Sequence, residues 1–290
     1  MQVKGSTLLR ALRSPYILLT PSFLYMIIIM GYPILYAINL ALRDPTTNEF
    51  TFNNIVVAYR YYKFGEALLY TFIIIFAVII LDFILATLIA LYFFTSRFKG
   101  SQLVFYIFII PLTLSEVAAA LIWYTMLSPT SHLNKFLLEL GVIEEPLQLF
   151  GYVFRHRTLL AIIIAEVWRT TALVFIILYA NMQLLNREYF EAADVFGFSF
   201  LDKLRHIILP LLKPAIESAL IIRTLLALQV YATPLVLSGL DIPVLSTITY
   251  YWFTERFNIN VASVYALIIG VIALTLGSLY IRTLRVRYEV

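Results

Sequence analysis

The sequence predicts an all-α membrane protein in which six transmembrane helices form a single domain over residues 1–290. Of the 290 residues, 62% are hydrophobic and 13% are charged, whereas soluble domains average about 45–50% apolar and about 25% charged residues. The mean hydropathy is +0.90, and six apolar stretches reach the length of about 20 residues that a bilayer crossing needs. These features exclude a water-soluble globule, a disordered chain and a collagen-like fibre.

The six predicted spans are separated by five connections, of which two, residues 43–66 and 128–158, are long and rich in turn and polar residues. In order, the spans are Tyr16–Leu42, Ala67–Thr95, Leu103–Leu127, Leu159–Leu184, Leu211–Leu240 and Val261–Leu284. Prolines in the first, third and fifth spans remove backbone donors and are expected to kink the helices. These prolines are Pro21, Pro33, Pro111, Pro214 and Pro234. Ordinary kinks in a packed bundle and a pathway lined by broken helices are both open interpretations.

The distribution of basic residues predicts that both termini lie in the cytoplasm. The net charge is +4, and basic residues of cytoplasmic loops set the orientation of membrane proteins. Seven basic residues fall on the opposite side, and two, Arg169 and Arg223, lie within spans. The predicted cytoplasmic side holds twelve: Lys4, Arg10, Arg13, Arg97, Lys99, Arg187, Lys203, Arg205, Lys213, Arg282, Arg285 and Arg287.

Several classes of chemistry are absent from the sequence. It has no cysteine, no G-x-x-x-x-G-K-[ST] phosphate-binding loop and no H-E-x-x-H zinc motif, and its three histidines are scattered. Basic residues form no block of the kind that binds nucleic acid. We therefore expect a protein that is not an enzyme and holds no metal or cofactor of its own.

The connection between spans four and five, residues 185–210, predicts two short helices joined by a sharp turn. Asn186 is a suitable N-cap for the first helix, which carries an apolar stripe at helical spacing. Gly197 can end that helix in a left-handed conformation. Ser199 and Asp202 have the spacing of a capping box for a second helix, which is expected to end near Leu209 and Pro210, at the start of span five. The two short helices are expected to be rigidly continuous with spans four and five.

Residues within this connection resemble the EAA signature of the permease subunits of ABC importers. Glu191-Ala192-Ala193 is followed after three residues by Gly197, and after nine more by Ile207-Ile208-Leu209-Pro210. Other segments are similar to the carbohydrate-type branch, namely Tyr32-Pro33-Ile34-Leu35-Tyr36, Ile110-Pro111, Ala119-Ala120-Leu121-Ile122-Trp123, Trp168 and Val236-Leu237-Ser238-Gly239.

Two segments depart from the family pattern. Phe196-Gly197-Phe198 stands where Asp-Gly-Ala is common, and Gly239-Leu240-Asp241-Ile242-Pro243 stands where Gly-Gly-Pro is frequent. Because of the first departure, polar contacts that the family's aspartate makes are not assigned to this sequence. The second concerns the shape of the outer loop.

The resemblance implies a cytoplasmic coupling loop between helices four and five that docks on a separate ATPase subunit. It assigns this role to Glu191, Ala192, Ala193, Gly197, Leu209 and Pro210; a solvated linker helix is the alternative. It also implies a prokaryotic inner or plasma membrane, a second permease subunit (a paralogue is favoured), two ATPase subunits that use ATP and Mg, and an extracellular or periplasmic solute-binding protein. The favoured cargo is a sugar. A polyol or glycerol-phosphate-like cargo and an ion-coupled secondary transporter are the alternatives.

Six ionisable residues lie inside apolar stretches, where a charge costs at least about 2.5–3.5 kcal/mol on insertion scales. They are Asp82, Glu116, Glu166, Arg169, Glu217 and Arg223. Glu166 and Arg169 share a helix face, whereas Glu217 and Arg223 each need a partner elsewhere. Asp82 and Glu116 are expected to pair between helices or subunits, with gating as the alternative.

A carboxylate beside an aromatic ring suits a sugar, because polar groups fix the hydroxyl pattern and the ring covers the C–H face. In the resembling family, the region around Trp168 and the middle of span five line the substrate cavity. The predicted substrate-binding residues are Glu166, Trp168, Arg169, Thr170, Gln229, Tyr231 and Thr233. The alternative is a structural Glu166–Arg169 pair with an interfacial Trp168 and a buried Tyr231.

Overall fold

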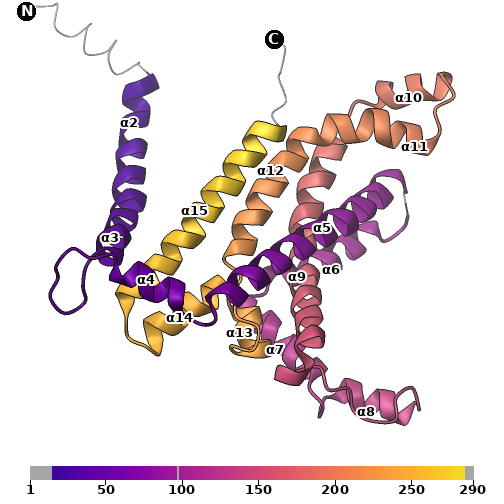
Figure 1. The fold of residues 1–290 in the computed structure, drawn as a ribbon. Coiled ribbons are helices and arrows are strands. Elements are labelled where there is room, and N and C mark those ends of the chain that lie inside the picture. Colours follow the sequence, from indigo (N-terminus) through magenta and orange to yellow (C-terminus); the bar gives the residue numbers. More distant parts are fainter. Residues whose placement is uncertain (1–14, 97, 285–290) are drawn as a thin grey trace, which may run out of the picture. The chain divides into compact units, whose positions relative to one another are not determined.

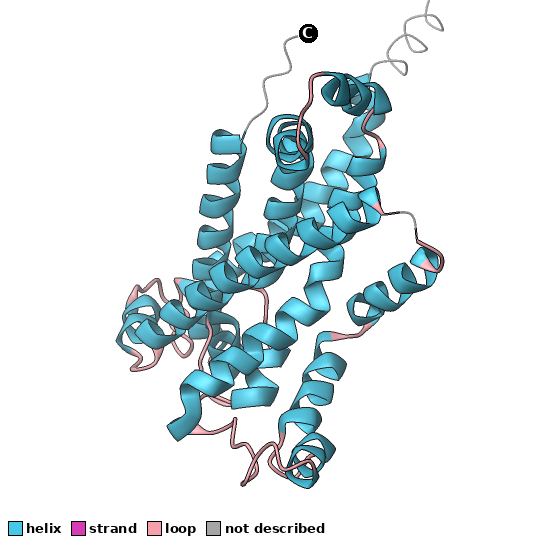
Figure 2. Ribbon diagram, turned by 90° about the vertical axis from the view of Figure 1, so that its right-hand side faces the viewer, coloured by secondary structure: helices cyan, strands magenta, loops and turns pink. Residues whose placement is uncertain are grey.

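The computed structural model describes residues 15–96 and 98–284. Every regular element in this part of the chain is a helix (Figure 2), and strand-like pairing is limited to an isolated bridge between Arg43 and Phe50. The all-α prediction is confirmed. Six of the basic residues used to predict the orientation lie outside the described residues, namely Lys4, Arg10, Arg13, Arg97, Arg285 and Arg287.

Four helical segments of the described chain are long and apolar enough to cross a membrane, and two further pairs of helices are bent at a break. The four are Leu19–Ala41, Phe64–Thr95, Tyr152–Gln183 and Ile259–Thr283. The predicted third span is the pair Ser101–Thr113 and Glu116–Glu139, bent by 101°. The predicted fifth span is the pair Phe200–Leu228 and Ala232–Ser238, bent by 44°. The described residues therefore provide four to six crossings, depending on whether each bent pair crosses once.

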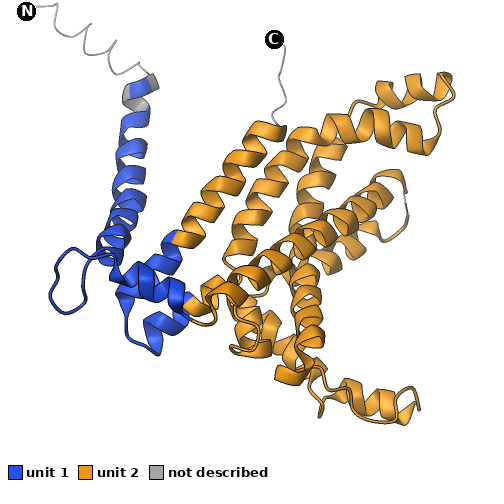
Figure 3. Ribbon diagram, in the orientation of Figure 1, with its two compact units in different colours: residues 1–61, 249–267 blue, residues 62–248, 268–290 orange. Residues whose placement is uncertain are grey.

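The chain forms two compact units (Figure 3). The first contains residues 1–61 and 249–267. Its elements are α2 (Pro15–Met26), a π-helical turn (Ile27–Gly31), α3 (Tyr32–Ala41), α4 (Asn53–Arg60) and parts of α14 (Leu245–Thr254) and α15 (Ile259–Leu284).

Two asparagines hold the first unit together. The end of α3 leaves backbone carbonyls without helical partners, and Asn54 Nδ2 donates to those of Ala41 and Arg43 at 3.0 and 2.8 Å. Asn260 Nδ2 donates to Leu40 and Arg43 at 2.9 and 2.8 Å. The same carbonyl of Arg43 thus joins α3, α4 and α15 within this unit.

The second unit, residues 62–248 and 268–290, carries the predicted functional residues. Its elements, with the remaining parts of α14 and α15, are α5 (Phe64–Thr95), α6 (Ser101–Thr113), α7 (Glu116–Leu127), α8 (His132–Glu139), α9 (Arg155–Gln183), α10 (Arg187–Val195), α11 (Phe200–Lys203), a π-helical turn (Leu204–Ile208), α12 (Leu209–Leu228) and α13 (Ala232–Ser238). In Figure 1, α10, α11 and the C-terminal end of α15 lie at one end of this unit, and α8 and α13 lie at the other.

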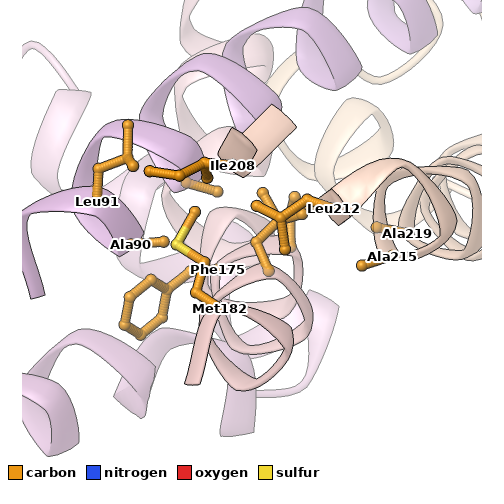
Figure 4. Close-up of a cluster of buried hydrophobic side chains, with 11 residues drawn as sticks. Ala90, Leu91, Phe175, Met182, Ile208, Leu212, Ala215 and Ala219 are labelled. Carbon is orange, nitrogen blue, oxygen red and sulfur yellow. The ribbon is translucent and has the colours of Figure 1, made fainter. Parts of the chain in front are cut away.

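Two hydrophobic clusters of the second unit lie on either side of a polar layer, and a third joins α5, α12 and α15. One joins α5, α9 and α12 toward the α10–α11 end (Figure 4) and includes Ala90, Phe175, Met182, Ile208 and Leu212. The other joins α5, α7, α9 and α13 and includes Ile74, Val78, Ala120, Ile162 and Leu237. Between these two clusters lie the buried Asp82 on α5 and the buried Thr170 and Thr171 on α9, which belong to the polar layer described below.

The helices accommodate their prolines in two ways. Pro33 and Pro210 each follow a π-helical turn, Ile27–Gly31 and Leu204–Ile208, and the helix continues past them. A π-turn is a wider ring that relieves the clash between a proline and the preceding turn. The second loop helix therefore does not end near Pro210 as predicted, whereas its predicted continuity with the fifth span is confirmed, because α11 passes through the π-turn directly into α12. Pro214 likewise lies inside α12 and does not end the helix. Pro111 and Pro234, in contrast, lie beside the two breaks.

Candidate functional site

The loop between α9 and α12 begins as the sequence predicts. Asn186 is the N-cap of α10, and its side-chain oxygen accepts a hydrogen bond from the backbone N–H of Glu188 at 3.1 Å. An asparagine in this position satisfies one of the free donors of the first turn. The N-terminal boundary of α10 is thus encoded locally.

Gly197 ends α10 through two hydrogen bonds that require a left-handed residue. Its φ is +73°, the Phe198 N–H donates to the Ala193 carbonyl at 2.9 Å, and the Gly197 N–H donates to the Asp194 carbonyl at 3.0 Å. This pattern is the Schellman motif. A Cβ at residue 197 would meet no atom within 4 Å, so the backbone conformation, and not space, is the reason for glycine.

The second loop helix, α11, is capped at its N-terminal end and joined to α10 by an ion pair. Ser199 and Asp202 form the predicted capping box, in which each side chain accepts from the other's backbone N–H, at 3.3 and 3.0 Å. Lys203 forms an ion pair with Asp194, which joins α11 to α10. Since α11 continues through the π-turn into α12, the turn at Gly197 is attached to a long helix of the bundle.

Contacts of the loop with the bundle are aromatic and aliphatic. The rings of Phe190 on α10 and Phe94 on α5 lie 5.6 Å apart, and Ile208 is buried in the cluster that α5, α9 and α12 share. Of the residues assigned to coupling, Ala193 is buried, whereas Glu191, Ala192, Gly197, Leu209 and Pro210 are exposed.

The loop also carries exposed apolar side chains that the motif does not indicate. Val195 is 87% exposed, Phe196 80% and Leu201 71%. Large exposed apolar patches are typical of interaction sites in proteins. The sequence signal for it was the departure at Phe196-Gly197-Phe198, where two aromatic residues replace the smaller polar pattern.

Within the bundle, a buried layer of polar residues joins α5, α9 and α12. The Asp82 carboxylate accepts hydrogen bonds from the Thr170 and Thr171 hydroxyls at 3.0 and 2.9 Å and from Arg223 Nε at 2.6 Å. Arg223 is 1% exposed, and neither of its Nη atoms has a hydrogen-bond partner. Asp82 is thus an inter-helix partner, as predicted, and it supplies the partner that Arg223 was expected to need.

Glu166 lies on α9 next to this layer. Its carboxylate accepts from the Thr233 hydroxyl of α13 at 2.5 Å and from Arg169 at 3.1 Å, so the structure contains the Glu166–Arg169 pair that was the alternative to a substrate-binding role. The Thr170 hydroxyl also lies 2.7 Å from the Glu166 carbonyl. Because Glu166 and Thr233 are both buried, neither is accessible in this conformation.

The other predicted substrate residues reach the surface to different degrees. Trp168 is 38% exposed, and its ring meets that of Trp123 edge-on at 5.9 Å. Gln229 is exposed at the end of α12, and Tyr231 is half-buried in the break. The structure therefore brings together Glu166, Arg169 and Thr233, directs Thr170 to Asp82, and leaves Trp168 and Gln229 exposed. Substrate binding by these seven residues stays a prediction.

Glu116, the first residue of α7, contacts the start of α13. Its Oε1 accepts hydrogen bonds from the backbone N–H groups of Tyr231, Ala232 and Thr233 at 2.8, 2.7 and 3.2 Å. Glu116 is therefore an inter-helix partner, as expected. Its partner is the start of a helix more than a hundred residues away in the chain, and nothing in the sequence predicts this contact.

Ion pairs and hydrogen bonds also fix the loop that follows α13. Arg155 Nε donates to the Asp241 carbonyl at 2.8 Å, while its Nη atoms bind both oxygens of Glu66 at 3.2 and 2.8 Å. Lys63 Nζ donates to the Leu240 carbonyl at 2.8 Å. The outer loop that departs from the family's Gly-Gly-Pro is thus held by α9 and the start of α5.

A cavity of about 400 Å³ lies at the other end of this unit, near the start of α10, with Phe93, Tyr179, Gln183 and Arg187 among its lining residues. None of the predicted substrate residues lines it. In the described part of the chain, no three His, Asp or Glu side chains are close enough to hold a metal ion.

Comparison with known proteins identifies relatives across most of the chain. Residues 83–287 match the family described as "Binding-protein-dependent transport system inner membrane component". The trehalose transport system permease protein SugA of Mycobacterium tuberculosis is 29% identical over 274 residues, covering 90% of this chain and 85% of that protein. The trehalose/maltose transport system permease protein MalF of Thermococcus litoralis is 34% identical over 145 residues, covering 50% of this chain and 48% of that protein.

A solved structure shares the fold. One chain of the bacterial ABC transporter involved in the import of the acidic polysaccharide alginate superposes with a TM-score of 0.82 at 22% identity, covering 98% of this chain and 96% of that one. At this identity the likeness concerns the fold alone.

The family match covers more than half of the chain and includes α9, α12 and the loop with its glycine turn, and it begins one residue after Asp82. The protein is accordingly a subunit of an inner-membrane transporter and not an enzyme. The chain belongs to the family of binding-protein-dependent transport system inner membrane components, the permease subunits of ABC importers.

Proposed function

We propose that this permease imports a sugar and that residues 185–210 couple it to a separate ATPase subunit. The observation that carries the proposal is the continuity of the loop with the bundle. The Gly197 turn and the capping box fix α10 against α11, and α11 runs without a break into α12. A displacement applied to the loop is therefore transmitted along α12.

The exposed face of the loop supports docking on another protein. Glu191 is available for an ion pair with a basic residue of the ATPase, and the exposed Ala192 permits close approach. Val195, Phe196 and Leu201 supply apolar area of the kind found at the centre of interfaces. In the proposed complex, closure of two ATPase subunits around ATP and Mg moves the loop, and only contacts that differ between the two states can bias the permease.

The proposed topology has six crossings in one domain over residues 1–290, with both bent pairs counted as single crossings. The C-terminal end of α15 lies at the same end of the second unit as α10 and α11 (Figure 1), which supports a cytoplasmic C-terminus beside the loop. The excess of basic residues on that side supports a cytoplasmic N-terminus as well.

Relatives and residue chemistry together support a sugar cargo. SugA and MalF are described as permeases for trehalose and for trehalose/maltose, and further relatives as permeases for sulfoquinovosyl glycerol and lactose. Another, more distant relative is described as a permease for sn-glycerol 3-phosphate. Trp168 presents a ring for the C–H face of a sugar, and Gln229 presents an amide for hydroxyls. Glu166, Arg169, Thr170, Tyr231 and Thr233 would complete the site after α13 moves. The glycerol-phosphate alternative is kept because of that distant relative.

The proposed assembly contains this chain, a second permease that is favoured to be a paralogue, two ATPase subunits and an extracellular solute-binding protein. One solved relative is described as a bacterial alginate ABC transporter in complex with an alginate pentasaccharide-bound periplasmic protein. That precedent supports delivery of cargo by a soluble protein.

The test is purification of the tagged chain in mild detergent, identification of the co-purifying chains, and reconstitution of the complex in liposomes. We expect an ATPase and a second permease, and ATP-dependent uptake of trehalose or maltose in the presence of the binding protein. Lactose and sn-glycerol 3-phosphate are the comparison solutes. A complex without an ATPase, or uptake of sn-glycerol 3-phosphate alone, would contradict the coupling or the cargo, respectively.

A further inference from the structure

The two bent spans have their breaks close together in the second unit. The α6–α7 break lies at Leu114–Ser115, and the α12–α13 break lies at Gln229–Tyr231. Each break frees backbone N–H groups that have no partner in their own helix. Inside a bilayer such donors need a protein partner, because hydrocarbon offers none.

The two breaks satisfy these donors differently. At the start of α7, the Ser115 hydroxyl accepts from the Ala118 N–H at 3.2 Å, so α7 is capped from within its own segment. At the start of α13, the acceptor comes from another helix: Glu116 Oε1 receives the N–H groups of Tyr231, Ala232 and Thr233. A carboxylate at this place also opposes the positive end of the α13 dipole.

A second carboxylate holds the same break from the other side. The Thr233 hydroxyl donates to Glu166 of α9, and Glu166 also binds Arg169. The backbone of α13 is therefore attached to α7, whereas one of its side chains is attached to α9. Loss of the Thr233–Glu166 hydrogen bond would leave α13 joined to α7 through Glu116, and in contact with α9 only through apolar packing such as that of Leu237.

We infer that Glu116 is a positioning residue that joins α7 and α13 into one unit and sets the backbone of residues 229–233. This inference rests on the proposed function in one respect, namely that Gln229, Tyr231 and Thr233 contact the cargo. Glu116 itself then acts without touching cargo. When α13 leaves Glu166 to admit a sugar, α7 moves with it, and residues 229–233 keep one conformation throughout.

The direct test is hydrogen exchange of the purified full complex, followed at the amides of residues 231–233. Glu116→Ala removes the acceptor and is expected to speed their exchange by at least about tenfold. Glu116→Gln keeps a carbonyl oxygen in place and is expected to stay within about threefold of the wild type. Glu217→Ala is the matched control, because Glu217 is a carboxylate of α12 with no hydrogen bond in the described structure. Unchanged exchange in Glu116→Ala, or equally fast exchange in Glu116→Gln, would overturn the inference.

The second readout is trehalose uptake per ATP hydrolysed in liposomes. We expect Glu116→Ala to assemble normally, to raise the KM for uptake and to lower uptake per ATP, with most of both restored in Glu116→Gln. Wild-type values in Glu116→Ala would overturn the role in transport. If the wild-type complex takes up no sugar, the proposed cargo fails, while the exchange experiment still decides whether Glu116 positions residues 229–233.

Discussion

The two ends of α12 lie beside prolines, yet the chain treats them in opposite ways. At the loop end, Pro210 follows the π-turn Leu204–Ile208 and the helix runs on unbroken from α11. At the far end, the helix stops at Gln229, and Pro234 belongs to a separate helix bent by 44°. At the loop end, α11, the π-turn and α12 form one continuous helix. At the far end, the backbone N–H groups at the start of α13 donate to Glu116 instead. Continuity is thus found where a partner would apply force, and a break is found where cargo would bind.

The largest effect is expected from a substitution of Gly197, at the loop end. Gly197→Val forces a β-branched residue into φ +73°, which costs the Schellman turn. We expect complete loss of ATP-driven uptake with normal membrane insertion, measured in liposomes and by membrane fractionation. Gly277→Ala, at a helical glycine with equal space around it, should transport normally. Normal uptake by Gly197→Val would show that the turn is not needed for coupling.

Between the two ends, the Asp82–Arg223 pair tests what holds α12 to its neighbours. Asp82→Leu leaves a buried guanidinium without its carboxylate, and we expect a loss of about 3–5 kcal/mol of stability. The double variant Asp82→Leu/Arg223→Met should recover most of it, because an apolar pair of similar volume carries no desolvation penalty. Thermal unfolding of the purified protein measures both. A double variant as unstable as the single one would show that the pair is not coupled.

At the broken end, Thr233→Val removes the hydroxyl that reaches Glu166 and keeps the side-chain shape. The buried carboxylate then loses one of its two side-chain donors, so we expect a loss of about 1–3 kcal/mol. Thr283→Val is the control, because the Thr283 hydroxyl is exposed and bonds only carbonyls of its own helix. Equal stability of the two variants would mean that the Thr233–Glu166 hydrogen bond contributes nothing to stability.

The smallest effect is expected at the continuous end, from the cap of α11. Ser199→Ala removes one member of the capping box, which costs about 1 kcal/mol, while Lys203–Asp194 and the Gly197 turn remain. Uptake should fall only slightly, and the amides of residues 200–203 should exchange faster. Ser218→Ala, which removes an exposed hydroxyl of α12, should change neither. Loss of uptake as large as in Gly197→Val would show that the cap, and not the turn, governs the loop.

Local features of this protein could be predicted from the sequence, and long-range ones could not. Asn186, Gly197 and Ser199 act within a few residues of themselves, so their spacing was sufficient. The Glu166–Arg169 pair is likewise a matter of one helical turn. Four of the six apolar stretches correspond to continuous helical segments, whereas the third and the fifth are each a pair of helices bent at a break, which the sequence left open.

Contacts that depend on how the helices pack could not be predicted from the sequence. Asp82 and Arg223 are 141 residues apart, and no periodicity says which helix faces which. The sequence signal showed only that each charge needed a partner. The π-turn before Pro210 was missed because a proline is equally compatible with a helix end and with a relieved helix, and packing of Ile208 in the core decides between them.

The buried pair also has a consequence for how such proteins diverge. A lineage that lost Asp82 first would carry an unpaired guanidinium inside its helix bundle. One that lost Arg223 first would keep a buried carboxylate whose remaining partners are two threonine hydroxyls. Neither intermediate is tolerable for long. Positions 82 and 223 should therefore change together among descendants of a common ancestor, and a census of homologous genes would reveal them as a covarying couple.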